Sequence, residues 1–144
     1  MSGRPAGFTL IETVLVLTLS GLLVLGGAQA VGRLGPKLRL QSGIWEVTSG
    51  LNQARFRAIL SGEAVRVRFL PSGFVFERYD AAAAAWRTSR RSVLEGVDLR
   101  ANNAPVFHPQ GTVSNMATIT VANSRGAYRI TIAITGRIRT TRSL

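Results

Sequence analysis

Cysteine is absent from this chain of 144 residues, and histidine occurs only once. Without cysteine there is neither a disulfide framework nor a cysteine metal site. The single histidine, His108, has no carboxylate beside it in the sequence, which is poor ground for catalysis or metal binding. No glycine-rich phosphate loop, zinc-ligand spacing or nucleophile elbow occurs. The sequence therefore indicates no enzyme, no cofactor, no metal and no small-molecule substrate.

Acidic residues are also scarce. Seven Asp and Glu stand against 18 Lys and Arg, and the formal net charge is +11. All but one of the basic residues are Arg. A GC-rich genome would by itself favour Arg over Lys, so this preference does not indicate a function. The length suits one domain plus an anchor.

One long apolar run lies near the N-terminus. It covers Phe8 to Val31, 24 residues in which Glu12 is the only charge. A membrane helix needs about 20 apolar residues, so this run is long enough to span a bilayer. Arg4 precedes the run, and basic residues tend to stay cytoplasmic. We therefore expect a single membrane segment over residues 8–32, with residues 33–144 folded across the membrane.

An ordinary secretory signal peptide is the simplest alternative. Its apolar region is usually roughly 7–15 residues long, and a carboxylate within it is atypical. A signal anchor with an accidental Glu12 is a second alternative. An ionisable group inside a membrane segment is costly and is read as functional by default, which favours a role for Glu12.

The residues Gly7-Phe8-Thr9-Leu10-Ile11-Glu12 closely resemble the leader of type IV pilins and type II secretion pseudopilins. The resemblance implies that residues 1–7 are a leader peptide, that a prepilin peptidase cuts after Gly7, and that the new amino group of Phe8 is methylated. It also implies that Glu12 pairs with the N-terminal amine of a neighbouring subunit. Such pairing offsets part of the hydration that both charges lose in an apolar medium. The expected location is the inner membrane with a periplasmic domain, or the assembled filament.

Beyond the membrane run the sequence predicts one helix. Gly26, Gly32 and Pro36 weaken or bend it, although a proline is tolerated in a first turn and can restart a helix. An apolar face with spacings of three and four then follows, and we expect the helix to end near residues 61–62. The residues of this face are Leu40, Ile44, Val47, Leu51, Ala54 and Ala58.

Alternating apolar and polar residues predict strands after the helix. In chain order we expect a strand over 65–69, a turn at 71–73, a strand over 74–79, a loop over 81–85, a short strand near Val93 and Val97, and strands over 116–121 and 128–135. A helix packed on an antiparallel sheet buries the apolar face of each. The expected fold class is α+β, which is the layout of the pilin superfamily.

The C-terminus adds a second resemblance. Residues 126–139, which end in Gly136-Arg137-Ile138-Arg139, are similar to the end of the GspH/FimT branch of minor pseudopilins. That branch tends to finish with a long hairpin and a Gly-Arg-x-Arg element. The outer half of the apolar run also lacks the proline that many major pilins carry there. Both features favour a minor subunit.

Five arginines and no acid occur between Arg125 and Leu144. Arginines without acidic neighbours attract the phosphates of DNA. If no bulge occurs at Gly136, one face of the last strand carries Arg129, Arg137 and Arg139. We therefore hypothesise DNA binding during natural transformation, as in some FimT-like minor pilins. The alternatives are a solvated basic surface or one that favours anionic headgroups. The arginines concerned are Arg125, Arg129, Arg137, Arg139 and Arg142.

The remaining candidates have structural interpretations. A second arginine group surrounds Glu95 and Asp98, and we interpret it as a partly neutralised surface. Trp45 is expected in the core and Trp86 is expected to anchor a loop. His108 is expected to be structural. The arginines of this second group are Arg87, Arg90, Arg91 and Arg100.

Three functions remain open. The first is a minor pilin of a type IV pilus that starts or caps the filament and binds DNA. The second is the H-type minor pseudopilin of a type II secretion system, without DNA binding. The third is a membrane-anchored receptor that never polymerises. In the first two the partners are other pilins or pseudopilins, the prepilin peptidase and the inner membrane.

Overall fold

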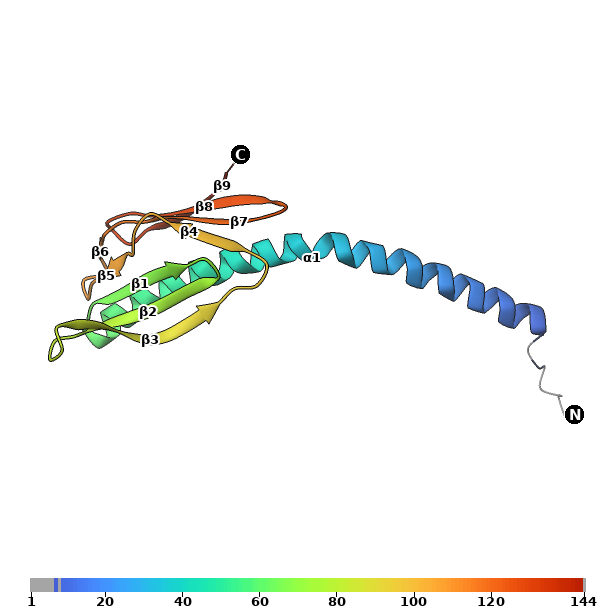
Figure 1. Ribbon diagram of the computed structural model, residues 1–144, viewed down its shortest axis with the longest axis horizontal. Coiled ribbons are helices and arrows are strands. Elements are labelled where there is room, and N and C mark those ends of the chain that lie inside the picture. Colours follow the sequence, from blue (N-terminus) through green and yellow to red (C-terminus); the bar gives the residue numbers. More distant parts are fainter. Residues whose placement is uncertain (1–6, 8, 144) are drawn as a thin grey trace, which may run out of the picture. The chain divides into compact units, whose positions relative to one another are not determined.

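The computed structural model describes Gly7 and residues 9–143, and for residues 26–33 it describes the backbone alone (Figure 1). The chain divides into two compact units, residues 1–35 and residues 36–144. Helix α1 extends from Leu10 to Ser61 and includes Pro36. The helix is continuous there, so it is not restarted at Pro36. Its predicted end, near residues 61–62, is confirmed.

Within the described residues, no helix combines the length and the apolar character that crossing a membrane requires. The predicted membrane segment over residues 8–32 includes Phe8 and the side chains of residues 26–32. These lie outside the described part of the chain, and the segment stays a prediction.

The strands that follow α1 form two antiparallel sheets. The first sheet has the order β3-β2-β1-β5-β6, and the second has the order β4-β7-β8-β9. The predicted α+β class, with a helix packed on antiparallel strands, is confirmed. The strands are β1 Val65–Leu70, β2 Gly73–Asp80, β3 Ala85–Val93, β4 Asp98–Ala101, β5 Val106–Phe107, β6 Val113–Ser114, β7 Thr118–Asn123, β8 Gly126–Ile132 and β9 Ile138–Ser143.

Two strand predictions need correction. A single short strand near Val93 and Val97 was expected, but β3 ends at Val93 and a separate strand, β4, begins at Asp98. The last strand was expected over 128–135, but β8 ends at Ile132 and pairs with β9 as a hairpin. Ile134 lies in the turn between them and is 61% exposed. Apolar alternation continues into this turn, so periodicity alone did not reveal the end of the strand.

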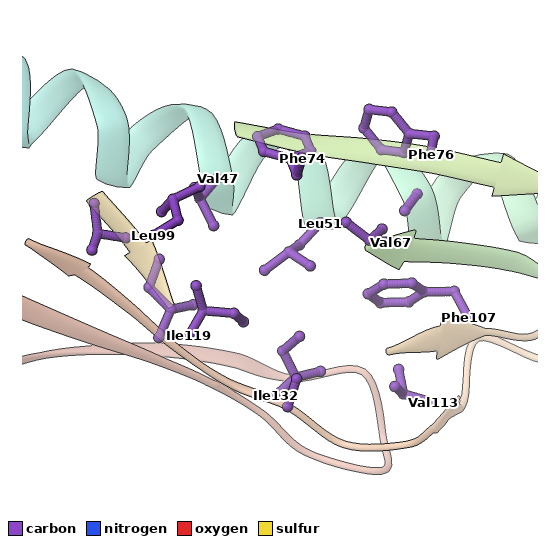
Figure 2. Close-up of a cluster of buried hydrophobic side chains, with 14 of the residues drawn as sticks. Val47, Leu51, Val67, Phe74, Phe76, Leu99, Phe107, Val113, Ile119 and Ile132 are labelled. Carbon is purple, nitrogen blue, oxygen red and sulfur yellow. The ribbon is translucent and has the colours of Figure 1, made fainter. Parts of the chain in front are cut away.

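The core lies between α1 and both sheets (Figure 2). The predicted helical face is buried except for Ile44, which is partly buried. Val47 and Leu51 of this face belong to one buried cluster with Phe74 of the first sheet and Ile119 of the second. Burial of such side chains contributes about 1.5–3 kcal/mol each, so this helical face holds both sheets together.

Arg55 of α1 ties the turn of the C-terminal hairpin to the helix. Its guanidinium donates from Nη2 to the carbonyl oxygen of Thr135 at 3.2 Å and from Nη1 to that of Gly136 at 3.4 Å. Gly136 has a φ of +77°. A Cβ there would lie 2.7 Å from the carbonyl oxygen of Gly111 and 2.8 Å from Nε of Arg55. The position therefore requires glycine for two reasons, backbone conformation and space.

Gly136→Ala should lower the free energy of unfolding by about 1–3 kcal/mol from backbone strain, with a further loss from the clash with Gly111 and Arg55. Urea unfolding of the full-length chain in a non-ionic detergent measures the change. Gly62→Ala is the matched control, because Gly62 has a φ of +68° but open space around the added Cβ. Equal losses in the two variants would show that the clash at Gly136 contributes nothing.

Candidate functional site

Glu12 lies in the first turn of α1, on the exposed surface of the helix. Its backbone N–H donates to the side-chain oxygen of Thr9 at 3.3 Å, so Thr9 caps the helix. A carboxylate in the first turn also interacts favourably with the helix dipole. Gly7 is described, whereas Phe8, the other residue of the predicted cleavage site, lies outside the described residues. The predicted roles of Gly7, Phe8 and Glu12 remain predictions.

A second apolar face runs along the solvent-exposed side of α1. Leu38, Trp45, Phe56, Ile59 and Leu60 are all exposed, with Trp45 at 74% and Phe56 at 63%. From Leu38 to Trp45 is seven residues, about two turns, and from Trp45 to Phe56 is eleven, about three turns. These side chains therefore lie on one stripe, opposite the core-facing residues.

Trp45 was expected in the core, and this expectation is wrong. Trp45 follows Ile44, which packs against the core, but it precedes the fully buried Val47 by two positions. A step of two residues is about 200° around a helix, so Trp45 faces away from the core. The apolar residues Leu38, Trp45 and Phe56, at spacings of seven and eleven that return to one side of a helix, are the signal that could have identified this second face.

The C-terminal hairpin places Arg129 and Arg139 on one face of the second sheet. Arg129 of β8 lies opposite Thr141, and Arg139 of β9 lies opposite Thr131. Residues directly opposite each other in an antiparallel pair point to the same side. Their placement on one face is as expected, but antiparallel pairing of two strands produces it rather than a single continuous strand.

The other three predicted arginines lie elsewhere. Arg137 is in the turn between β8 and β9, where its carbonyl accepts a 2.9 Å hydrogen bond from the N–H of Ala133. The condition that no irregularity occurs at Gly136 is therefore not met. Arg142 lies opposite Tyr128, on the other face of the hairpin. The backbone of Arg125 is held in the β7–β8 turn by the side chain of Asn123.

Arg100, which the sequence placed with the second arginine group, shares the face of Arg129 and Arg139. It lies opposite Thr120 of β7, and Thr120 lies opposite Arg129 of β8. Its side chain is 86% exposed, and Nε is 3.4 Å from the carboxylate of Asp98. Only the pairing of β4 with β7 reveals this grouping, because the residues are far apart in the sequence.

Four arginines of the first sheet, namely Arg66, Arg68, Arg78 and Arg87, are paired with acids more closely. Glu77, only 4% exposed, accepts hydrogen bonds from Nε of Arg66 at 2.6 Å and of Arg68 at 3.0 Å. Arg87 lies 2.7 Å from Asp80. The expectation of a partly neutralised surface was based on Glu95 and Asp98, whereas for Arg87 the partner is Asp80.

Trp86 and His108 have the local contacts of structural residues. Trp86 packs edge-on against Tyr79, with ring centroids 5.4 Å apart, and the guanidinium of Arg66 lies 4.4 Å from its ring centroid. Nε2 of His108 is 2.8 Å from the hydroxyl of Ser114. Across the part of the chain that the structure describes, no three His, Asp or Glu residues are grouped so that they could hold a metal ion.

Comparison with known proteins identifies relatives of this chain. A family model described as Type II transport protein GspH matches residues 45–136. The minor pseudopilin EpsH of the Vibrio cholerae type II secretion system has a similar fold, with 20% identity and a TM-score of 0.57 over 74% of this chain and 95% of EpsH. No curated protein sequence matches the chain.

The type IV minor pilin FimU of Pseudomonas aeruginosa is also similar, with 18% identity and a TM-score of 0.60 over 73% of this chain and 90% of FimU. A second EpsH structure gives 16% identity and a TM-score of 0.61 over 74% of this chain and 95% of that chain. At these identities the likeness establishes the fold alone, whereas the family match covers well over half of the chain. The chain therefore belongs to the GspH family and is a minor pseudopilin or pilin, a structural subunit of filaments.

Proposed function

We propose that this protein is processed by a prepilin peptidase and assembles at the start or tip of a type IV pilus or a type II secretion filament. Cleavage follows Gly7, Phe8 receives the methyl group, and Glu12 contacts the terminal amine of a neighbouring subunit. The protein is anchored in the inner membrane through residues 8–32 before assembly. Its globular domain is periplasmic.

The exposed apolar stripe on α1 is the observation that carries the proposal. Trp45 and Phe56 lie on the same side of the helix with most of their surface in contact with solvent. Burying side chains of this size contributes about 1.5–3 kcal/mol each, so a partner that covers the stripe gains substantially. Helices of neighbouring subunits supply such a partner in a filament.

Replacing Trp45 and Phe56 together by serine should reduce incorporation into filaments at least tenfold, because two large apolar contacts are lost. Immunoblotting of sheared filaments against total cellular protein measures this ratio. The control is Asn52→Ser, a polar-to-polar change on the exposed side of the same helix. Unchanged incorporation of the double variant would mean that the stripe is not an assembly contact.

Glu12→Gln should also abolish most incorporation while leaving cleavage after Gly7 intact, since it removes the charge and keeps the shape of the side chain. The mass of the purified protein reports the loss of residues 1–7, and filament immunoblots report assembly. Glu95→Gln, an exposed acid remote from α1 in sequence, is the control. Normal incorporation and function of the Glu12 variant would instead favour an anchored receptor that does not polymerise.

Deletion of the gene distinguishes a role in a type IV pilus from a role in a type II secretion system. Loss of transformation and twitching indicates a pilus, whereas loss of protein secretion indicates a type II secretion system. The second result would favour the H-type minor pseudopilin without DNA binding.

DNA binding is the second candidate function, and the distribution of charge favours it. Strands β7, β8 and β9 contain three arginines and no acid. Further arginines occupy the turns at 125 and 137. Double-stranded DNA carries about one negative charge per 1.7 Å of its axis, so such a surface attracts it without reading its sequence.

The full-length chain should retain double-stranded DNA in a filter assay at modest salt and lose it as the salt concentration rises, since binding releases counterions. Replacing Arg137 and Arg139 by glutamate should lower the affinity at least tenfold. The same two changes at Arg87 and Arg90, in β3, control for net charge. If retention is unchanged by charge reversal at Arg137 and Arg139, this arginine cluster does not bind DNA.

A further inference from the structure

Strand β3 is an open edge of the first sheet. Within the described residues, the order β3-β2-β1-β5-β6 gives it a neighbouring strand on one side alone (Figure 1). An edge strand presents backbone N–H and C=O groups with which another strand can pair. Strand β3 covers nine residues, and most of its side chains are exposed. Its pairing with β2 is regular over residues 90–93, which lie beyond the bulge at Ser89.

The backbone groups of Arg91 and Val93 point to this open edge. The N–H of Leu94 donates to the carbonyl oxygen of Ser72 at 2.8 Å, so the backbone of Leu94 faces β2. Successive residues of an antiparallel strand direct their backbone groups alternately to its two sides. The backbone groups of Val93 and Arg91 therefore face away from β2. Each of these residues offers a donor and an acceptor to an added strand.

A hollow of about 260 Å³ lies beside this stretch of β3. It is lined by Arg90 and Ser92 of β3, by the buried rings of Phe74 and Phe76 of β2, and by α1, which contributes the exposed Trp45. A cavity of about 150 Å³ accommodates benzene, so the hollow has room for a large apolar side chain. Side chains alternate along a strand, and every second one of an added strand would point toward this hollow.

The open edge is also basic. Strand β3 contains three arginines and no acid. The exposed Arg91 has neither an ion pair nor a hydrogen bond among the described residues. Arg90 donates to the side-chain amide oxygen of Gln53 at 3.4 Å. Opposite charges that face each other across paired strands stabilise the pair, so a carboxylate opposite Arg91 is favoured.

The side of the edge that faces α1 has a different preference. Glu46 of α1 lines the hollow and accepts a hydrogen bond from the hydroxyl of Ser92. A second carboxylate placed there would meet a like charge. The residue that enters the hollow is therefore apolar, and the acid belongs on the opposite side of the added strand, next to Arg91.

A second copy of this chain does not fit the edge. Pairing residues 90–93 with the same segment of another copy brings arginines together, and like charges directly opposite each other are destabilising. The net charge of +11 adds a general repulsion between copies. The edge therefore selects a different and more acidic protein.

We propose that residues 90–93 of β3 accept an extended segment of a different filament subunit as an additional strand, in which acidic residues alternate with apolar ones. This inference rests on the proposed assembly into a filament and specifies the partner. Backbone hydrogen bonds give strand addition its affinity, and pockets for alternate side chains give it specificity. Trp45 belongs both to the apolar stripe and to the hollow, so the strand contact is continuous with the proposed helix contact.

Two variants at one position test the backbone pairing. Val93→Pro removes an N–H that faces the partner and leaves the ladder with β2 in place, a position where edge strands tolerate proline. Val93→Ala shortens the same side chain and keeps the N–H. The ratio of protein in sheared filaments to total cellular protein should be about tenfold lower for proline than for alanine, because a carbonyl of the partner is left unsatisfied. Equal ratios for the two variants would overturn the proposal.

A charge reversal tests the proposal without a change in the backbone. Arg91→Glu sets like charges opposite each other and should lower incorporation at least tenfold. Arg142→Glu, in β9 of the second sheet, makes the same change in net charge and should leave incorporation unchanged. If Arg91→Glu is incorporated as well as the unsubstituted chain, the edge does not bind an acidic strand.

Photo-cross-linking identifies the occupant of the edge. Val93 is replaced by p-benzoylphenylalanine, which keeps the backbone N–H, and the cross-linked peptide from assembled filaments is sequenced by mass spectrometry. A segment of another protein with alternating acidic and apolar residues is expected. A second copy of this chain, a segment without acids or the lack of any product would contradict the inference. If the unsubstituted chain itself is missing from sheared filaments, the proposed assembly is wrong.

Discussion

The packing of one helical face against two sheets determines the arrangement of the globular unit. The residues of α1 that meet the sheets include small ones, and this lets the strands come close: a Cβ added to Gly50 would lie 2.6 Å from the ring of Phe74. Interiors are packed at crystal-like density, so this contact fixes the rotation of the helix about its axis. With the rotation fixed, Trp45 and Phe56 must face outward. The exposed apolar stripe is thus a consequence of how the core is packed.

Sequence periodicity predicted those elements that bury one face and expose the other. The helical face from Leu40 to Ala58 and the first residues of β1 have this character, and both elements are confirmed. Strand β2 was also predicted and is confirmed, although its residues 73–77 are buried on both sides. Strand β3 lacks this character because it is an edge strand whose residues are nearly all exposed, so no apolar alternation marks it. The last strand was predicted to extend too far, to residue 135, because the apolar Ile134 continues the alternating pattern although it lies in the turn after β8.

The candidate site residues were predictable to different degrees. Gly7, Phe8 and Glu12 belong to one local motif, which can be recognised in the sequence without any knowledge of the fold. Arg129 and Arg139 were grouped as positions of one continuous strand, whereas they share a face because they belong to neighbouring strands of one hairpin. Arg100 could not be grouped with them, since the pairing of β4 with β7 joins segments about twenty residues apart and depends on register. A shift of one residue would turn Arg100 to the other face of the sheet.

The surfaces proposed for assembly and for DNA binding lie on opposite sides of the same core. The apolar stripe lies on the side of α1 that faces away from the sheets, and Arg100, Arg129 and Arg139 lie on the side of the second sheet that faces away from α1. A subunit whose stripe is covered by neighbouring helices would therefore still expose its charged face. The two surfaces also differ in physical character. A contact at the apolar stripe would be stabilised by burial of apolar area, whereas a contact at the charged face would be stabilised by electrostatic attraction that salt weakens. Substitutions on one face should for this reason leave the other function intact, and the two proposals can be tested independently in the same protein.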